Sequence, residues 1–277
     1  MKKRLFVIIL AFSFLLTGCT QNSAEANNTL PENTPVATYT TPSSHTLITD
    51  TADTPAFNEN AETGLSLPPS AVDDNKPMVA ITFDDGPGKY TQRLLDILSD
   101  NGGKATFFVI GNTLDKKSEL LKLIAEEGHE IGSHSWDHRQ LTKLTDEEIA
   151  DQIKSTKEKI YDITGRETNI LRPPYGSVNE NVTQVCKDNG VIIVKWSVDP
   201  HDWKNKDTNT IYEIIMANLD DGDIILCHDI HATTIDAMEI IIPSLIEKGY
   251  QLVTVSELLN SADREISAGE IYSHKYD

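Results

Sequence analysis

Hydrophobic and polar positions follow a regular pattern only after residue 76 of the chain. From there to about residue 255, short runs of β-branched and aromatic residues are separated by longer stretches with apolar residues at helical spacing. Seven of the short runs predict strands: MVAITF, KATFFVI, EIGSH, NILRPP, VIIVKWSV, DIILCH and QLVTV. Strand–helix alternation repeated about seven times predicts an α/β fold with a parallel sheet, open or closed into a distorted (β/α) barrel.

The clearest predicted helix covers residues 145–165. Thr145 and Glu148 have the spacing of a capping box at its start, and Gly165 is a typical stop signal at its end. Four isoleucines mark one face of this helix: Ile149, Ile153, Ile160 and Ile163. A second helical candidate covers residues 90–102, which also ends in a glycine-containing stop.

Residues 19–76 differ from the rest of the chain. They are rich in Thr, Asn, Ser, Pro and Ala, and residues 20–75 carry eight acidic residues with no Lys or Arg. Neither a helical nor an alternating period is sustained there, so the segment predicts a disordered spacer. The chain is therefore divided into this spacer, a folded domain over residues 77–262 and a C-terminal tail over residues 263–277.

The first 18 residues have the pattern of a signal peptide. Three basic residues at positions 2–4 precede an apolar run over residues 5–16. About twelve apolar residues are too few to span a bilayer, which needs roughly twenty, but they suit a secretory signal. The ending LTGC resembles the lipobox of bacterial lipoproteins, in which Cys19 becomes the lipidated first residue. This predicts an extracytoplasmic protein anchored to the bacterial cell membrane; a plain secretory signal with an incidental cysteine is the alternative.

The net charge of the chain limits the kinds of partner that are expected to bind it. The formal net charge is −19, and removal of a basic signal peptide makes the mature chain more acidic still. Nucleic-acid binding needs clustered Lys and Arg, so no nucleic acid is expected. An acidic surface also disfavours electrostatic attraction to anionic lipid, so membrane contact is expected through the lipid anchor only. The sequence does not fix the oligomeric state.

Two cysteines remain in the predicted folded domain, Cys186 and Cys227. A secreted disulfide framework normally has several cysteines at close spacings, whereas these two lie far apart. We interpret both as small buried residues. A single bridge between them is the alternative.

Chemically suggestive residues follow five of the predicted strands, and strand ends are where a barrel of this kind gathers its active site. The first strand ends in Asp84 and Asp85, and Gly86 and Pro87 then turn the chain so that both carboxylates could face the same space. A simple acidic turn is the alternative, because Asp, Gly and Pro are common turn residues.

The third predicted strand is followed by His134 and His138, four positions apart. On a helical or tight turn this spacing aims two imidazole rings at one point. Together with one oxygen of Asp85 they would supply two nitrogens and a carboxylate. Three protein ligands with an open position describe a catalytic metal site rather than a structural one. Two ordinary exposed histidines are the alternative.

The remaining strand ends carry further candidates. In RPPYG the two prolines make a stiff segment that holds Arg172 and leaves the backbone N–H of Tyr175 free to donate a hydrogen bond. A purely structural loop is the alternative. Asp202 and Trp203 follow VIIVKWSV. The segment LCHD covers residues 226–229. Alternate residues of a strand share a face, so the side chains of Leu226 and His228 are expected to point into the site and that of Cys227 away from it. His231 is interpreted as a rim or surface residue.

Taken together, these segments resemble the polysaccharide deacetylases of the NodB-homology type, carbohydrate esterase family 4. TFDDGP, H-S-x-x-H, R-P-P-Y-G, D-x-x-D-W and L-x-H-D all occur in the family's order, across residues 78 to about 255. Each motif is weak alone, but five in order are specific. The fourth motif reads DPHDW where a small residue is more usual after the first Asp, which is a minor departure.

The resemblance implies a metal-dependent removal of N-acetyl groups. Asp85, His134 and His138 would hold one divalent ion; zinc is the first choice, and cobalt, manganese or nickel would also suit this ligand set. Asp84 would take the proton of the attacking water, and Arg172 would pair with Asp84 to keep it ionised and oriented.

The other residues of the motifs complete the implied mechanism. The backbone N–H of Tyr175 would stabilise the oxyanion. His228 would protonate the departing amine, and Asp202 would face His228 and favour its protonated form. Trp203 and Leu226 would shape an apolar pocket for the acetyl methyl group.

A lipid-anchored deacetylase would lie next to peptidoglycan, so N-acetylglucosamine of peptidoglycan is the expected substrate. Relatives that act on N-acetylmuramic acid often have Asn where Asp85 stands, so the intact pair favours the glucosamine activity. Deacetylation of chitin oligosaccharides and de-esterification of acetylxylan are alternatives within the family. A catalytically inactive carbohydrate-binding lipoprotein is a remote alternative, because no ligand or base of the motifs is missing.

Overall fold

The computed structural model describes residues 72–277. The predicted signal peptide, Cys19 and nearly all of the predicted spacer lie outside the described residues. Within residues 72–277, no helix has both the length and the apolar content needed to cross a membrane.

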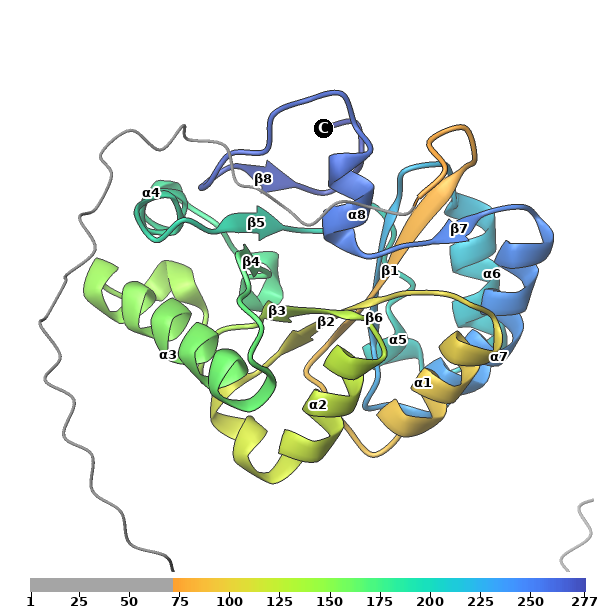
Figure 1. Ribbon diagram of the computed structural model, residues 1–277, viewed down its shortest axis with the longest axis horizontal. Coiled ribbons are helices and arrows are strands. Elements are labelled where there is room, and N and C mark those ends of the chain that lie inside the picture. Colours follow the sequence, from red (N-terminus) through yellow and green to blue (C-terminus); the bar gives the residue numbers. More distant parts are fainter. Residues whose placement is uncertain (1–71) are drawn as a thin grey trace, which may run out of the picture. The chain divides into compact units, whose positions relative to one another are not determined.

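A single curled sheet forms the centre of the described part of the chain (Figure 1). Its strands are β1 (Met78–Asp84), β2 (Thr106–Val109), β3 (Glu130–Ser133), β4 (Ile170–Leu171), β5 (Ile192–Val194), β6 (Ile224–His228), β7 (Gln251–Leu252) and β8 (Ile271–Tyr272). They are hydrogen-bonded in the order β6-β1-β2-β3-β4-β5-β8, with β7 paired to β1, and all of these pairs are parallel. Each of the seven predicted runs contains one strand, so the predicted parallel sheet is confirmed.

The sheet is a distorted barrel, as predicted. The segment that follows β5 turns back to β6, where Val198 and Ile225 form an isolated parallel bridge. The Ser197 N–H donates to the carbonyl of Ile224 at 3.0 Å, and the Leu226 N–H donates to the carbonyl of Val198 at 2.9 Å. These contacts join the segment after β5 to β6 over a short stretch only, so the closure is incomplete.

The structure adds a strand that the sequence analysis did not predict. Strand β8 lies in residues 263–277, the segment expected to be a C-terminal tail, and its Ile271 and Tyr272 pair with Ile193 and Val194 of β5. Figure 1 shows β8 running beside β5 at the edge of the sheet. The last residues are therefore part of the folded sheet.

Helices connect the strands on the outside of the sheet (Figure 1). They are α1 (Thr91–Asp100), α2 (Ser118–Glu126), α3 (Asp146–Thr164), α4 (Glu180–Asp188), α5 (Asp202–Asn205), α6 (Thr208–Asn218), α7 (Ala232–Glu247) and α8 (Val255–Asn260), with 3₁₀ turns η1 (Gly111–Lys117), η2 (Leu141–Lys143) and η3 (Pro174–Gly176). The predicted capping box of α3 is confirmed, with reciprocal hydrogen bonds between Thr145 and Glu148. Gly165 ends the helix at φ 68°, a left-handed conformation that glycine adopts without strain.

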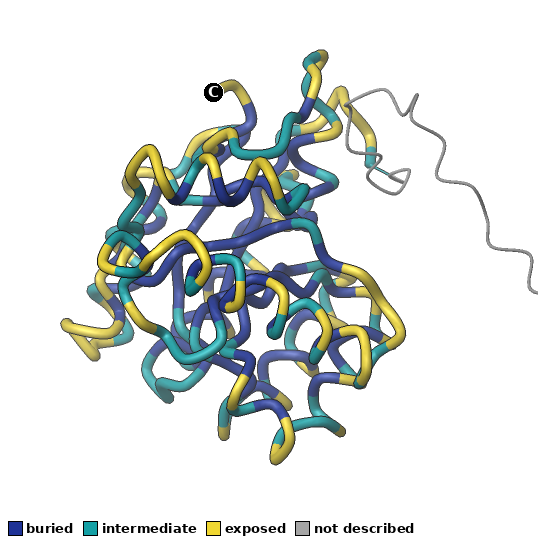
Figure 2. Tube along the Cα trace, turned by 90° about the vertical axis from the view of Figure 1, so that its left-hand side faces the viewer, coloured by how far each residue is buried: buried dark blue, intermediate teal, exposed yellow. Residues whose placement is uncertain are grey.

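Alternate residues of the strands face two different cores, which explains how the site is positioned. Odd-numbered residues of β1, such as Val79 and Ile81, pack with the apolar faces of α1, α2 and α7. Even-numbered Met78 and Ala80 pack instead with inward residues of β2, β4, β5 and β6 and with α8. Figure 2 shows the buried segments in dark blue gathered in the interior. Continuing this alternation to the strand ends brings polar side chains to the mouth of the barrel.

Both cysteines of the folded domain are buried and unpaired. Cys186 lies in α4 and Cys227 in β6, and they belong to two different hydrophobic clusters. The interpretation of both as small buried residues is confirmed, and they form no disulfide bridge with each other.

Candidate active site

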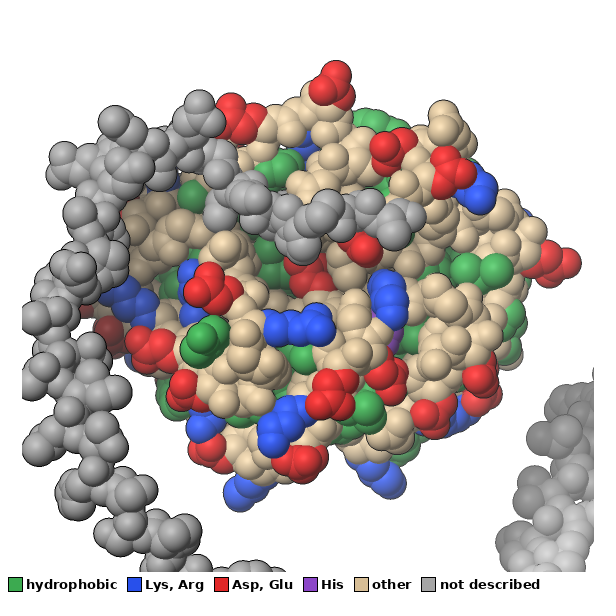
Figure 3. All heavy atoms as spheres, in the orientation of Figure 1, with side chains coloured by type: hydrophobic (Ala, Val, Ile, Leu, Met, Phe, Trp, Pro, Cys, Tyr) green, Lys and Arg blue, Asp and Glu red, His purple; other side chains and the backbone are tan. Residues whose placement is uncertain are grey.

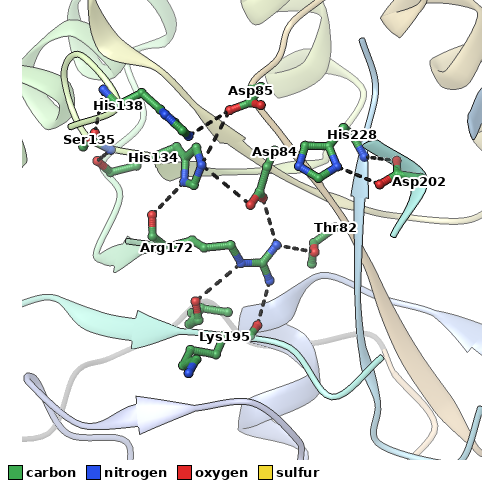
Figure 4. Close-up of polar contacts among 12 residues, drawn as sticks. Thr82, Asp84, Asp85, His134, Ser135, His138, Arg172, Lys195, Asp202 and His228 are labelled. Atoms are coloured by element: carbon green, nitrogen blue, oxygen red, sulfur yellow. Dashed lines mark hydrogen bonds and ion pairs between the residues drawn. The ribbon is translucent and has the colours of Figure 1, made fainter. Parts of the chain in front are cut away.

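Three side chains surround one point at the C-terminal ends of β1 and β3 (Figure 4). Oδ1 of Asp85 lies 3.6 Å from Nε2 of His134 and 3.4 Å from Nε2 of His138. These three atoms lie within 4.8 Å of one another. The structure therefore brings the predicted ligand set together.

The two histidines converge through a loop and not through a helical turn. Residues 134–138 have no helical structure, and Ser135 and His138 have positive φ values of 67° and 62°. Oε1 of Gln152, on α3, accepts hydrogen bonds from the backbone N–H groups of Trp136 and Asp137 at 2.8 and 3.1 Å. The side chain from α3 thus fixes the loop whose backbone aims both rings.

Hydrogen bonding fixes the orientation of the His134 ring. Its Nδ1 lies 2.7 Å from the carbonyl oxygen of Arg172, which can only accept a hydrogen bond. Nδ1 must therefore carry a proton, which leaves Nε2, on the side of Asp85, as the nitrogen that can bind a metal. An imidazole held this way is the usual form of a metal-ligating histidine.

The site suits a divalent cation. Oδ1 of Asp85 is buried and has no hydrogen-bond partner among the described residues, so a bound cation would satisfy it. Burial lowers the pKa of His138, and so does the neighbouring His134, although Asp85 and Asp84 oppose them. The lowered pKa favours the neutral ring that can bind a metal. Two imidazole nitrogens and one carboxylate oxygen fit zinc, cobalt, manganese or nickel.

Asp84 lies beside this point but is held by a different partner. Its Oδ1 accepts a hydrogen bond of 2.9 Å from Nη1 of Arg172, and its Oδ2 lies 3.8 Å from Nε2 of His134. Both Asp84 and Arg172 are buried, at 3 % and 0 % exposed. A buried carboxylate with one free oxygen next to a cation site is a candidate for accepting a proton.

Arg172 is fixed from several sides by residues outside the RPP segment. Its guanidinium donates to Oγ1 of Thr82 at 2.5 Å and to the carbonyls of Val194 and Lys195 at 3.4 and 2.8 Å. The ring of Phe108 lies 4.2 Å from its Cζ. The guanidinium has little freedom to move, so it positions the Asp84 carboxylate.

His228 and Asp202 form a second pair, on the other side of Asp84 (Figure 4), in which the Asp202 side chain is fully buried and that of His228 is 13 % exposed. His228 is the β6 partner of Asp84, and its Nδ1 lies 2.8 Å from Oδ1 of Asp202. Burial lowers the pKa of His228, but the hydrogen bond and charge of Asp202, with help from Asp84 and Asp85, outweigh it and raise the pKa to about 8.

Asp202 is the anionic partner in this pair. Burial raises the pKa of Asp202, but its hydrogen bonds to His228 and Thr234 and the charge of His228 lower it below its usual value. Its Oδ2 accepts from the His228 N–H and from Oγ1 of Thr234, each at 2.8 Å. The pair therefore has the form of an ionised carboxylate that holds a protonated imidazole.

The RPPYG segment presents a backbone donor near His138. Tyr175 has a φ of 61°, and its ring lies edge-on to that of His138 at 5.0 Å between centroids. The N–H groups of Gly176 and Ser177 donate to the carbonyls of Pro173 and Pro174. Within residues 72–277 the Tyr175 N–H donates to no backbone carbonyl, and its role as an oxyanion donor stays a prediction.

The predicted pocket residues lie on the His228 side. Leu226 is 5 % exposed and precedes His228 by two positions on the same face of β6, whereas Trp203 is 52 % exposed on α5. Their role in an acetyl pocket stays a prediction. His231 lies at the rim, with its ring centroid 6.2 Å from that of His228.

Besides Gln152, three residues that support the site were not predicted from the sequence. Thr82 accepts from Arg172 and donates to the Ile225 carbonyl at 2.6 Å. Its inward position, two residues before Asp84, was a signal that could have identified it. Thr234 binds Asp202 from the first turn of α7, and nothing in the local sequence marks it.

Asp229 is the third, and it packs directly against the turn after Asp85. Its buried carboxyl accepts a hydrogen bond from the Thr91 hydroxyl, and burial raises its pKa to about 6. A Cβ added to Gly86 would lie 2.3 Å from its Oδ1. The glycine in TFDDGP is therefore required for this close approach, and Asp229 supports the backbone that carries Asp85.

Comparisons with known proteins identify the family of the chain. A family described as "Polysaccharide deacetylase" matches residues 71–194. Peptidoglycan-N-acetylglucosamine deacetylase PgdA of Listeria monocytogenes is 41 % identical over 200 residues, which cover 72 % of this chain and 42 % of that protein. Peptidoglycan-N-acetylmuramic acid deacetylase PdaC of Bacillus subtilis is 42 % identical over 196 residues, which cover 70 % of this chain and 41 % of that protein. The matched part thus spans about two fifths of the length of these relatives.

A solved structure described as "T48 deacetylase with substrate" has the same fold. It superimposes with a TM-score of 0.69 at 41 % identity, and the match covers 73 % of this chain and all of that chain. Fold, motif order and sequence identity together confirm the resemblance inferred from the sequence. The chain belongs to the polysaccharide deacetylase family, the NodB-homology group of carbohydrate esterase family 4.

Proposed function

We propose that the protein is a metal-dependent hydrolase that removes N-acetyl groups from a cell-wall polysaccharide, with N-acetylglucosamine of peptidoglycan as its substrate. One observation carries this proposal. Asp85, His134 and His138 surround a common point, Asp84 lies beside it and is held by Arg172, and His228, held by Asp202, lies on the other side of Asp84 (Figure 4). This arrangement supplies a metal site, a base and an acid for amide hydrolysis.

Asp85, His134 and His138 would hold the divalent ion, for which zinc is the first choice. When bound, such an ion polarises the acetyl carbonyl and makes a nearby water more acidic. The chain supplies the remaining groups. The backbone N–H of Tyr175 donates a hydrogen bond to the acetyl carbonyl oxygen and stabilises the negative charge that develops there.

Asp84 accepts the proton of the attacking water in this proposal. The water oxygen forms a bond to the acetyl carbon, and the proton moves to Oδ2 of Asp84, because Oδ1 is already engaged by Arg172. The 2.9 Å contact keeps the carboxylate from turning, so the free oxygen stays directed at the site.

His228 acts next, as the acid. The C–N bond breaks as a proton passes from His228 to the departing nitrogen, because an amine anion is too poor a leaving group without it. Acetate and a free amino sugar are the products. Nδ1 of His228 is bonded to Asp202, so the proton that is transferred comes from Nε2.

The substrate is proposed from the family and from the first motif. The relatives named above include one deacetylase of N-acetylglucosamine and one of N-acetylmuramic acid, at nearly equal identity, so identity alone does not discriminate between them. The intact Asp84-Asp85 pair favours the glucosamine residue. Chitin oligosaccharides and acetylxylan are the alternative substrates.

The proposal is tested by acetate release from four purified substrates. We expect the protein to deacetylate N-acetylglucosamine residues of peptidoglycan glycan strands with the highest kcat/KM. Chitin tetramer, acetylxylan and strands whose only remaining acetyl groups lie on muramic acid serve as comparisons. Mass spectrometry of digested strands identifies the sugar that lost its acetyl group. Exclusive loss from muramic acid, or a preference for xylan, would reject the proposed substrate.

We further propose that the protein is extracytoplasmic and held at the membrane by lipid on Cys19. This part rests on the signal-peptide pattern and on the cell-wall substrates named for the relatives. In cells fed labelled palmitate, the full chain is expected to take up label and sediment with membranes. Cys19→Ser is expected to lose both properties. A Cys19→Ser protein that still carries label would reject the anchor.

A further inference from the structure

A cavity of about 430 Å³ lies between the loop after β1 and the start of α2. Its lining includes three lysines: Lys89, Lys116 and Lys117. The loop after β1 also carries Asp85, and η1 follows β2, so the cavity opens at the same ends of the strands as the candidate active site. None of the residues assigned to metal binding or proton transfer lines it.

The lysines of this cavity lack acidic partners. Within residues 72–277 none of the three forms an ion pair with Asp or Glu; Lys89 instead lies 5.2 Å from the ring centroid of Tyr90. The acidic residue in the lining, Glu119, pairs with Lys122 at 3.0 Å. Unpaired like charges in one cavity repel one another, so they favour a bound anion.

Lys117 connects the cavity to the active site. Burial lowers its pKa, while the carboxylates of Asp229 and Asp85 act in the opposite direction. The Lys117 ammonium thus lies within electrostatic reach of Asp85. Pro87 and Gly88, which also line the cavity, follow Asp85 by two and three positions, so an anion bound there would lie near the candidate metal site.

The overall charge of the chain makes this cluster unusual. The protein has 24 Lys and Arg against 43 Asp and Glu, and on the face drawn in Figure 3 basic and acidic side chains are interspersed. An acidic protein repels an acidic glycan at long range. A local group of positive charges next to the site offsets that repulsion where the substrate must bind.

We propose that Lys89, Lys116 and Lys117 bind a carboxylate of the wall glycan, next to the N-acetyl group that is removed. This inference rests on the proposed function and deepens it, because chitin is neutral whereas peptidoglycan strands carry carboxylates. The carboxylate belongs either to the lactyl group of a peptide-free muramic acid or to the stem peptide. Lysine is a flexible point charge and accepts either without a fixed geometry.

The test is a binding measurement with ligands that differ only in charge. Peptide-free glycan tetrasaccharides are compared with the same tetrasaccharides after conversion of their lactyl carboxylates to amides. The wild type is expected to bind the carboxylate form about tenfold more tightly, and the preference is expected to fall with added salt. The triple variant Lys89→Gln, Lys116→Gln, Lys117→Gln is expected to bind both forms equally. Peptide-bearing fragments that bind more tightly than peptide-free ones would assign the carboxylate to the stem peptide.

Two single variants are the controls. Lys248→Gln lies at the end of α7, away from the strand ends that carry the site, and Lys143→Gln lines a different cavity that borders His138 and Tyr175. Both are expected to keep the preference. Equal binding of the carboxylate, amide and peptide-bearing forms by the wild type, a preference retained by the triple variant, or its loss in Lys143→Gln would each overturn the inference. A wild-type protein that prefers the carboxylate form but releases no acetate would instead reject the proposed function and still support the carboxylate-binding site.

Discussion

Replacement of Asp84 by Asn is expected to lower kcat by about 10²- to 10⁴-fold, the usual contribution of a positioned base. The amide keeps the shape of the carboxylate and can still accept a hydrogen bond from Arg172, but it cannot take a proton from water. Because Asp84 is not among the three groups that surround the metal point, metal content is expected to stay near that of the wild type. Acetate release and metal analysis on the same preparation check both statements.

The variant also removes the negative partner of a buried guanidinium. Leaving a buried charge unpaired costs about 3–5 kcal/mol, although the carbonyls of Val194 and Lys195 and the Thr82 hydroxyl still accept from Arg172. A lower melting temperature is therefore expected. The activity should be measured well below that temperature, with circular dichroism as a check on folding.

His134→Ala is the matched control for this variant. It should lose both metal and activity, whereas Asp84→Asn should lose only activity. An Asp84→Asn protein with kcat within tenfold of the wild type would contradict the role of Asp84 as the base. It would also favour the remote alternative, a carbohydrate-binding protein without catalysis, if wild-type turnover were equally low.

Much of the fold was readable from the sequence because the strands bury both faces. β1 is buried along its whole length, so it appears in the sequence as the mostly apolar run MVAITF, with Thr82 as its polar member. β8 gave no such signal. Its two residues, Ile271 and Tyr272, stand between polar neighbours, and only pairing with β5 makes them a strand. A strand this short has no period to detect.

The side chains of the site were predictable, but the backbone that aims them was not. The spacing of His134 and His138 correctly suggested convergence, yet the mechanism is a loop with two positive φ values held by Gln152, sixteen positions after Trp136. Contacts of that separation leave no local pattern. Thr234 was missed for the same reason, because its bond to Asp202 joins residues that are distant in sequence.

Replacement of His228 by Gln is expected to lower kcat on N-acetyl substrates by about 10²- to 10⁴-fold. Glutamine cannot deliver a proton to the departing nitrogen. An O-acetyl ester releases an alcohol, which is a far better leaving group than an amine and depends less on that proton. The loss should therefore be much smaller when the same variant is assayed on an acetyl ester, and this difference identifies the step that His228 serves.

The pH profile gives a second sign of the same role. Because the pKa of His228 is raised to about 8, the protonated form is fully present below its ordinary value of 6.5 and is lost as pH rises through about 8. Activity, and the stability contributed by the His228–Asp202 pair, should fall over that interval. In Asp202→Asn the hydrogen-bonded charge is gone while burial still lowers the pKa, so the fall should move to lower pH.

His231→Gln is the control for the histidine substitution, since its ring lies 6.2 Å from that of His228 but at the rim. Its kcat is expected to stay within about threefold of the wild type, as for a residue outside the proton-transfer pair. Equal losses on amide and ester substrates in His228→Gln would mean that the imidazole acts before bond cleavage, by binding or orienting the acetyl group. If the pH at which activity falls moves higher in Asp202→Asn, the Asp202 carboxylate does not stabilise the imidazolium of His228. That result would contradict the assignment of His228 as the acid.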